Sequence, residues 1–173
     1  MQKTILTYGL ICGAVLGGFM LATVPFMENV GDWGYVVGYA SMLLGFLLVY
    51  FGVRSYRDNV AGGRISFGRA LLVGGAIAFI GMCCYVATWE VVYHTMMPDF
   101  MDKYAARQID KVRASGASAE AVAKKQQEMD AAVQMYKNPV MNVAFTFLEP
   151  LPVAIILTLV SAAVVRRREP VPA

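Results

Sequence analysis

The sequence predicts an all-α integral membrane protein, with four transmembrane helices in a bundle and an extracytoplasmic helical hairpin between the third and fourth helices. The composition supports this class, because 58% of the 173 residues are hydrophobic and only 16% are charged. Soluble domains carry about 25% charged residues. The charges are also segregated, which leaves long apolar stretches between them. This pattern excludes a disordered chain and argues against nucleic acid as a partner, despite the net charge of +3.

Four nearly uncharged stretches are long enough to cross a membrane. An α-helix rises about 1.5 Å per residue, so about 20 residues cross a hydrocarbon core about 30 Å thick. In lipid, every backbone N–H and C=O group must be paired within the protein, and a helix achieves this. The predicted transmembrane helices cover residues 5–27, 33–53, 70–95 and 140–165. The first stretch lacks a small-residue cleavage motif, so we expect it to remain as an uncleaved helix.

The distribution of basic residues predicts the orientation of these helices. Positive charge stays on the cytoplasmic side of a membrane. The predicted loop 54–69 and the C-terminus are rich in arginine. The short loop between the first two helices contains Glu28 and Asp32 and no basic residue. We therefore expect a multi-pass membrane protein with both termini in the cytoplasm. Membrane lipid is an expected partner, because arginines at this surface attract anionic head groups. The candidate head-group ligands are Arg54, Arg57, Arg64, Arg69, Arg166, Arg167 and Arg168.

The stretch 98–138 is polar and has the pattern of two helices outside the membrane. Pro98 and Asp99 favour a helix start, and Ser115-Gly116 interrupts the apolar spacing. Ser118 can cap a second helix, which ends before Pro139 or continues into the fourth transmembrane helix with a kink there. Two roles stay open for this hairpin: a solvated connector, or a cap that binds a partner protein or gates a substrate.

Small residues recur at every fourth position of the predicted transmembrane helices. This spacing allows close helix packing, and a face left over could form a homodimer. The residues are Gly9, Gly13 and Gly17; Gly34, Gly38, Ser41 and Gly45; Gly74, Ala78 and Gly81; and Ala154, Thr158 and Ala162. The three cysteines, Cys12, Cys83 and Cys84, have no metal-ligand spacing, and we interpret them as buried packing residues.

Two glutamates inside the apolar stretches are the candidate polar site, because a charge in lipid needs a compensating reason. Counted from the cytoplasmic boundary, Glu90 lies about 30 Å along its helix and Glu149 about 24 Å, which puts both near the outer leaflet. His94 follows Glu90 by one turn and shares its face. Pro150 and Pro152 lack N–H groups and predict a helix break beside Glu149.

Three interpretations of these glutamates remain open. They could fix helix packing through hydrogen bonds, line an outward crevice for an ion, lipid or solute, or form a metal or catalytic site with His94. The sequence contains no zinc-protease, nucleophile-elbow or phosphate-loop motif and no paired C-x-x-C. We therefore assign no catalytic residue, no metal ligand and no cofactor.

Several short motifs resemble those of the domain of unknown function 4199 family, and the similarity covers about residues 5–168. The motifs are Ser66-Phe67-Gly68-Arg69-Ala70 followed by Gly74, Pro98-Asp99-Phe100, and Glu149-Pro150-Leu151-Pro152-Val153, continuing through Ser161-Ala162 to Arg166-Arg167-Arg168. The resemblance implies a small bacterial inner-membrane protein with four helices, and it implies no activity.

The functional hypothesis from the sequence is a non-enzymatic membrane protein. It would bind a partner protein or lipid through its bundle and outer hairpin, and it could form a homo-oligomer. The alternative hypothesis is a small transporter or channel that uses Glu90 and Glu149 in an outward-facing crevice.

Overall fold

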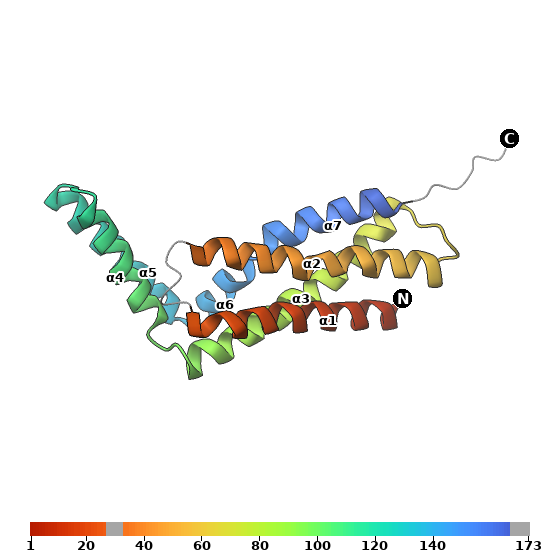
Figure 1. Ribbon diagram of the computed structural model, residues 1–173, viewed down its shortest axis with the longest axis horizontal. Coiled ribbons are helices and arrows are strands. Elements are labelled where there is room, and N and C mark those ends of the chain that lie inside the picture. Colours follow the sequence, from red (N-terminus) through yellow and green to blue (C-terminus); the bar gives the residue numbers. More distant parts are fainter. Residues whose placement is uncertain (27–32, 167–173) are drawn as a thin grey trace. The chain divides into compact units, whose positions relative to one another are not determined.

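The computed structural model describes residues 1–26 and 33–166, and these residues are almost entirely helical, with no β-strand among them (Figure 1). The elements are α1 (Gln2–Thr23), the 3-10 helix η1 (Val24–Phe26), α2 (Trp33–Asn59), α3 (Phe67–Thr95), α4 (Phe100–Ala114), α5 (Ala119–Lys137), α6 (Pro139–Leu148) and α7 (Leu151–Val165). In the described part, four stretches are long and apolar enough to cross a membrane: Gln2–Phe26, Val36–Asn59, Phe67–Thr95 and Pro139–Val165. The prediction of an all-helical chain with four such stretches is confirmed.

The chain divides into two compact units, which we describe separately. The first unit comprises Met1–Trp89 and Phe147–Ala173, and the second comprises Glu90–Thr146. In the first unit, α2 packs against both α1 and α7. The N-terminus, the connection between α2 and α3 and the end of α7 lie at the same end of this unit (Figure 1).

The first unit has an apolar core and an apolar surface. Leu16, Phe46 and Ile77, from α1, α2 and α3, lie in one buried cluster. Leu44 and Ile156 are more than half exposed, and many other large apolar side chains are exposed in the same way. A soluble protein rarely exposes large apolar patches, whereas lipid tails are as apolar as these side chains. The exposed apolar side chains are therefore consistent with helices that face lipid.

The glycine face of α1 is a close-packing surface, as its spacing predicts. Added Cβ atoms at Gly9 and Gly17 would lie 2.8 Å from Ile80 and Thr88 of α3, and one at Gly13 would overlap Cys84. These α3 residues recur every fourth position, so the two helices meet along matching faces. In α2, by contrast, Cβ atoms added at Gly34 and Gly38 would meet no atom within 4 Å. The homodimer expected from leftover small residues stays a prediction.

The connection between α2 and α3 is shorter than the predicted loop 54–69. Helix α2 continues to Asn59, so Arg54 and Arg57 lie on the helix, and α3 already contains Arg69. Arginine is a good helix former, so a helix readily extends beyond its apolar segment. Gly62 and Gly63 make the turn with φ values of 66° and 83°, which side chains other than glycine rarely adopt.

The cysteines do not share one environment. Cys12 is buried and donates a hydrogen bond to the Gly45 carbonyl at 3.4 Å, as a packing residue would. Cys83 is exposed and Cys84 is partly buried, so the prediction of burial is wrong for Cys83. In a membrane helix, apolar residues suit both the positions that face the core and those that face lipid. An apolar stretch alone therefore does not show which of its residues are buried.

In the second unit, α4 and α5 pack against each other. Asp99 precedes α4 and pairs with Lys103 at 3.1 Å, and Gly116 turns the chain with a φ of 77°. The Ser118 hydroxyl accepts a hydrogen bond from the Ala121 N–H at 3.2 Å and so caps α5. The extended residue Asn138 separates α5 from α6, so the two are distinct helices.

Aromatic and apolar side chains hold the second unit together. Ile109 of α4 and Val133 of α5 are buried. The Tyr136 ring packs edge-on against Tyr93 of α3, with 5.5 Å between centroids, and lies 6.5 Å from the Phe100 ring. These rings join the last turn of α3 to both α4 and α5.

Candidate functional site

The predicted intramembrane site residues fall into different units. Glu149, Pro150 and Pro152 belong to the first unit, whereas Glu90 and His94 belong to the second. Each group is therefore described within its own unit. The arginines predicted to contact lipid form a third group, at the end of the first unit where α2 and α7 finish.

Glu149 lies at an interruption between two helices. Helix α6 ends at Leu148 and α7 begins at Leu151, so Glu149 and Pro150 form the junction. Proline supplies no N–H group, so the helical hydrogen-bond ladder cannot continue through Pro150 and Pro152. The ladder restarts when the Ala154 N–H donates to the Pro150 carbonyl at 2.9 Å. The break thus occurs where the two prolines predict it.

The Glu149 carboxylate has a specific partner on another helix. The Tyr85 hydroxyl of α3 donates a hydrogen bond to Glu149 Oε2 at 3.0 Å. Next to it, the Phe147 ring packs edge-on against the Phe79 ring of α3, with 5.9 Å between centroids. A hydroxyl bonded to a carboxylate forms one of the stronger hydrogen bonds in proteins. This arrangement links the helix break to α3, and Glu149 remains exposed.

Sequence reasoning missed Tyr85, although a depth count could have found it. Tyr85 lies about 22 Å along α3 from Ala70, and Glu149 lies about 24 Å from Val165. The predicted counterpart, Glu90, lies about 30 Å along the same helix. The phenol is thus the polar group on α3 that best matches the depth of Glu149.

Glu90 and His94 form an ion pair within the second unit when the imidazole is protonated. His94 Nε2 lies 3.4 Å from Glu90 Oε2, and the imidazole is mostly exposed. The other oxygen, Glu90 Oε1, is buried and has no hydrogen-bond partner among the described residues. Across residues 1–26 and 33–166, no three His, Cys, Asp or Glu residues gather closely enough to hold a metal ion.

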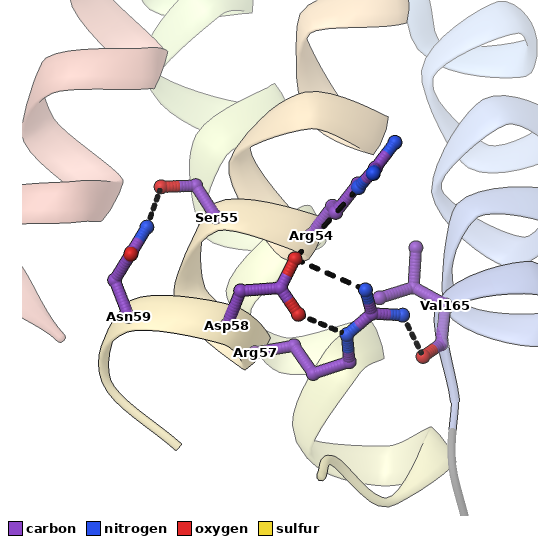
Figure 2. A network of polar contacts seen from close by, with 6 residues as sticks. All are labelled: Arg54, Ser55, Arg57, Asp58, Asn59 and Val165. Atoms are coloured by element: carbon purple, nitrogen blue, oxygen red, sulfur yellow. Dashed lines mark hydrogen bonds and ion pairs between the residues drawn. The ribbon is translucent and has the colours of Figure 1, made fainter. Parts of the chain in front are cut away.

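At the end of the first unit, Arg57 joins α2 to α7 (Figure 2). Its guanidinium donates to both carboxylate oxygens of Asp58, at 2.6 and 3.1 Å, and to the carbonyl of Val165 at 3.2 Å. Val165 is the last residue of α7, and a cation is favourable at the carbonyl end of a helix. Only 9% of Arg57 is exposed. Arg57 therefore acts as a buried link between two helices and is not accessible to lipid head groups.

The remaining arginines differ in accessibility. The Arg54 side chain is exposed, with Nε 3.7 Å from Asp58 Oδ2. Arg64, Arg69 and Arg166 are exposed and line one groove. Arg167, Arg168, Glu28 and Asp32 lie outside the described residues.

The fold places the chain in a class of small proteins that, over residues 1–26 and 33–166, consist of helices and include four stretches long and apolar enough to cross a membrane. Within that class, the chain belongs to the family described as "Protein of unknown function (DUF4199)", whose model matches residues 7–167. No curated protein matches the chain, and no solved structure matches it.

Proposed function

We propose that this chain is a non-enzymatic protein of the bacterial inner membrane that binds a partner protein through α4 and α5. In this proposal the four apolar stretches form a bundle, both termini are cytoplasmic, and α4 and α5 form a hairpin on the outer side. The observation that carries the proposal is the packing of α4 on α5 within a unit separate from α1, α2 and α7. Such a pair offers a binding surface that does not disturb the membrane helices.

The end of this helix pair provides a surface suited to a protein partner. An open hollow of about 630 Å³ is lined by Arg113, Val122 and Gln126, with three alanines between them. Arg113 forms an exposed ion pair with Asp110 at 2.8 Å at the rim of the hollow. Of these residue types, arginine is enriched at protein interfaces, so Arg113 is the side chain that best suits a protein partner.

The orientation is tested with reporter fusions. Alkaline phosphatase inserted at Ser115 is expected to be active, because this enzyme folds only outside the cytoplasm. A fluorescent protein that folds only in the cytoplasm is expected to fluoresce when fused after Arg168. The physical reason is the excess of arginine at the ends that we assign to the cytoplasm. Inactive phosphatase at Ser115, or a dark fusion after Arg168, would contradict the orientation.

The partner is tested by removing the helix pair. A chain in which a short Gly-Ser linker replaces residues 100–136 is expected to reach the membrane and keep its helical content, because the core of the first unit contains none of the removed residues. The amount of partner protein recovered with this shortened chain is expected to be at most one-tenth of the amount recovered with the full chain. The measurement is quantitative mass spectrometry after cross-linking in cells.

A matched control separates the binding surface from the bulk of the helices. The double variant Val122→Glu, Gln126→Glu keeps both helices and changes only the hollow, so it should lose the same partner. If the deleted chain is folded and recovers the same proteins as the full chain, the proposal fails.

A second candidate function is transport of a cation through a site at Glu149. The observation that favours it is a carboxylate beside a broken helix, bonded through only one of its oxygens by Tyr85. Irregular backbone at membrane depth survives where it is buried in protein or lines a wet cavity. In this candidate function, Glu149 would bind the cation and Tyr85 would orient the carboxylate.

A further inference from the structure

A groove of about 1130 Å³ opens at the end of the first unit where the N-terminus, the α2–α3 connection and the end of α7 meet. Its polar lining comes from Tyr56, Arg64, Ser66, Arg69 and Arg166. These residues lie on three separate segments of the chain, so the groove exists only in the folded unit.

The groove is strongly basic. Three of its lining residues are arginines, and none of the lining residues is acidic. Within residues 1–26 and 33–166, the Arg64 and Arg166 side chains have no hydrogen-bond or ion-pair partner. The nearby acid Asp58 is bonded by Arg57 through both of its oxygens. The positive charge of the groove is therefore not neutralised by the described residues.

One guanidinium is held in place for an anion. Arg69 Nε donates to the Tyr56 hydroxyl at 3.1 Å, and its guanidinium carbon lies 5.9 Å from the centroid of the same ring. Tyr56 is 1% exposed, so its position is set by the core. No described residue accepts a hydrogen bond from the terminal nitrogens of Arg69. The first turn of α3, which begins at Phe67, adds the partial positive charge of a helix N-terminus.

The groove also has an apolar side, and it lies level with the ends of the apolar stretches. Val60 and Phe67 line it and are 49% and 37% exposed. The candidate spans end at Asn59 and Val165 and begin at Phe67, all beside the groove. Guanidinium groups next to exposed apolar side chains at this level match the two parts of a phospholipid: its phosphate and the start of its acyl chains.

We propose that this groove binds the phosphate of an anionic phospholipid. Arg64, Arg69 and Arg166 contact the phosphate oxygens, and Val60 and Phe67 contact the glycerol and the first acyl carbons. Guanidinium groups suit this role because each can give two parallel hydrogen bonds to a phosphate. This site is independent of the partner surface proposed above, because it lies in the other unit.

The test is native mass spectrometry of the full-length protein, released from detergent with phosphatidylglycerol or phosphatidylcholine of the same chain length. We expect phosphatidylglycerol to bind at least tenfold more tightly. Arg64→Ala and Arg166→Ala should each weaken its binding about fivefold, which corresponds to the typical contribution of one basic residue near an anionic surface. The matched control is Arg54→Ala, which removes the same charge from the same end outside the groove and should change binding less than twofold.

Other results would overturn the proposal. If Arg54→Ala weakens the binding of phosphatidylglycerol as much as Arg64→Ala does, the lipid is attracted by the general surface charge and not by the groove. Equal binding of the two lipids would show that the groove has no preference for an anionic head group. If inorganic phosphate at millimolar concentration displaces phosphatidylglycerol and depends on the same arginines, the ligand is a free anion. Among the described residues, the Arg64 and Arg166 side chains have no hydrogen-bond or ion-pair partner, so their variants should melt like the unchanged protein, which a thermal unfolding curve checks.

Discussion

Gly13→Leu is expected to lower the free energy of unfolding by about 2–3 kcal/mol or more, the range of strongly overpacked cores. A Cβ atom at Gly13 would already overlap the Cys84 side chain, including its Cβ atom. A Cβ atom is fixed to the backbone and cannot rotate away, so α1 and α3 would have to move apart. The expected fall in melting temperature is roughly 5–10 °C. Thermal unfolding of the full chain in detergent, followed by circular dichroism, measures it.

The matched pair Gly13→Ala and Gly38→Ala isolates the effect of close packing. Both changes add one methyl group to a glycine within a helix, and alanine favours a helix by about 1 kcal/mol over glycine. At Gly38 no atom lies within 4 Å of the added methyl group, so we expect equal or higher stability. At Gly13 the overlap should outweigh the gain, so this variant should melt lower. Two Gly13 variants as stable as the unchanged chain would contradict the packing of α1 on α3.

If the second candidate function holds, Glu149→Gln is expected to abolish cation flux. The amide keeps the size of the side chain and can still accept the bond from Tyr85, but it has no negative charge to attract a cation. Tyr85→Phe should reduce the flux several-fold, because the carboxylate loses the bond that orients it. The measurement is uptake of protons, Na⁺ or K⁺ by liposomes that contain the full chain.

The control for this experiment is Glu120→Gln, the same chemical change at an exposed position in the first turn of α5. It should leave the flux unchanged. If the unchanged protein gives no flux above that of empty liposomes, or if Glu149→Gln transports as well as the unchanged protein, the transport hypothesis is excluded. The hydrogen bond from Tyr85 would then serve helix packing alone.

The features that the sequence predicts well are those encoded within one segment. The all-helical class follows from charge-free stretches, the face of Gly9, Gly13 and Gly17 from its spacing, and the cap at Ser118 from local chemistry. Each depends on residues within a few positions of one another. Their physical causes, namely backbone pairing in lipid and helix capping, act locally.

The features that the sequence did not reveal depend on how helices are rotated against each other. The Tyr85–Glu149 bond joins residues 64 positions apart, and the Arg57–Val165 bond joins residues 108 positions apart. Spacing along one helix does not determine which face meets another helix. For the same reason, the sequence did not distinguish the buried Arg57 from the arginines expected to contact lipid. It also did not distinguish the exposed Cys83 from a core residue.

The bond from Arg57 to Val165 has a consequence for biosynthesis. The ribosome makes α2 early, yet one acceptor for its buried guanidinium is the carbonyl that closes the final helix. Until α7 has been translated, Arg57 can bond only to the two carboxylate oxygens of Asp58, and the face of α2 that packs on α7 stays uncovered. Contacts between segments so far apart in the chain form late. The core of the first unit is therefore incomplete until the last helix has been made.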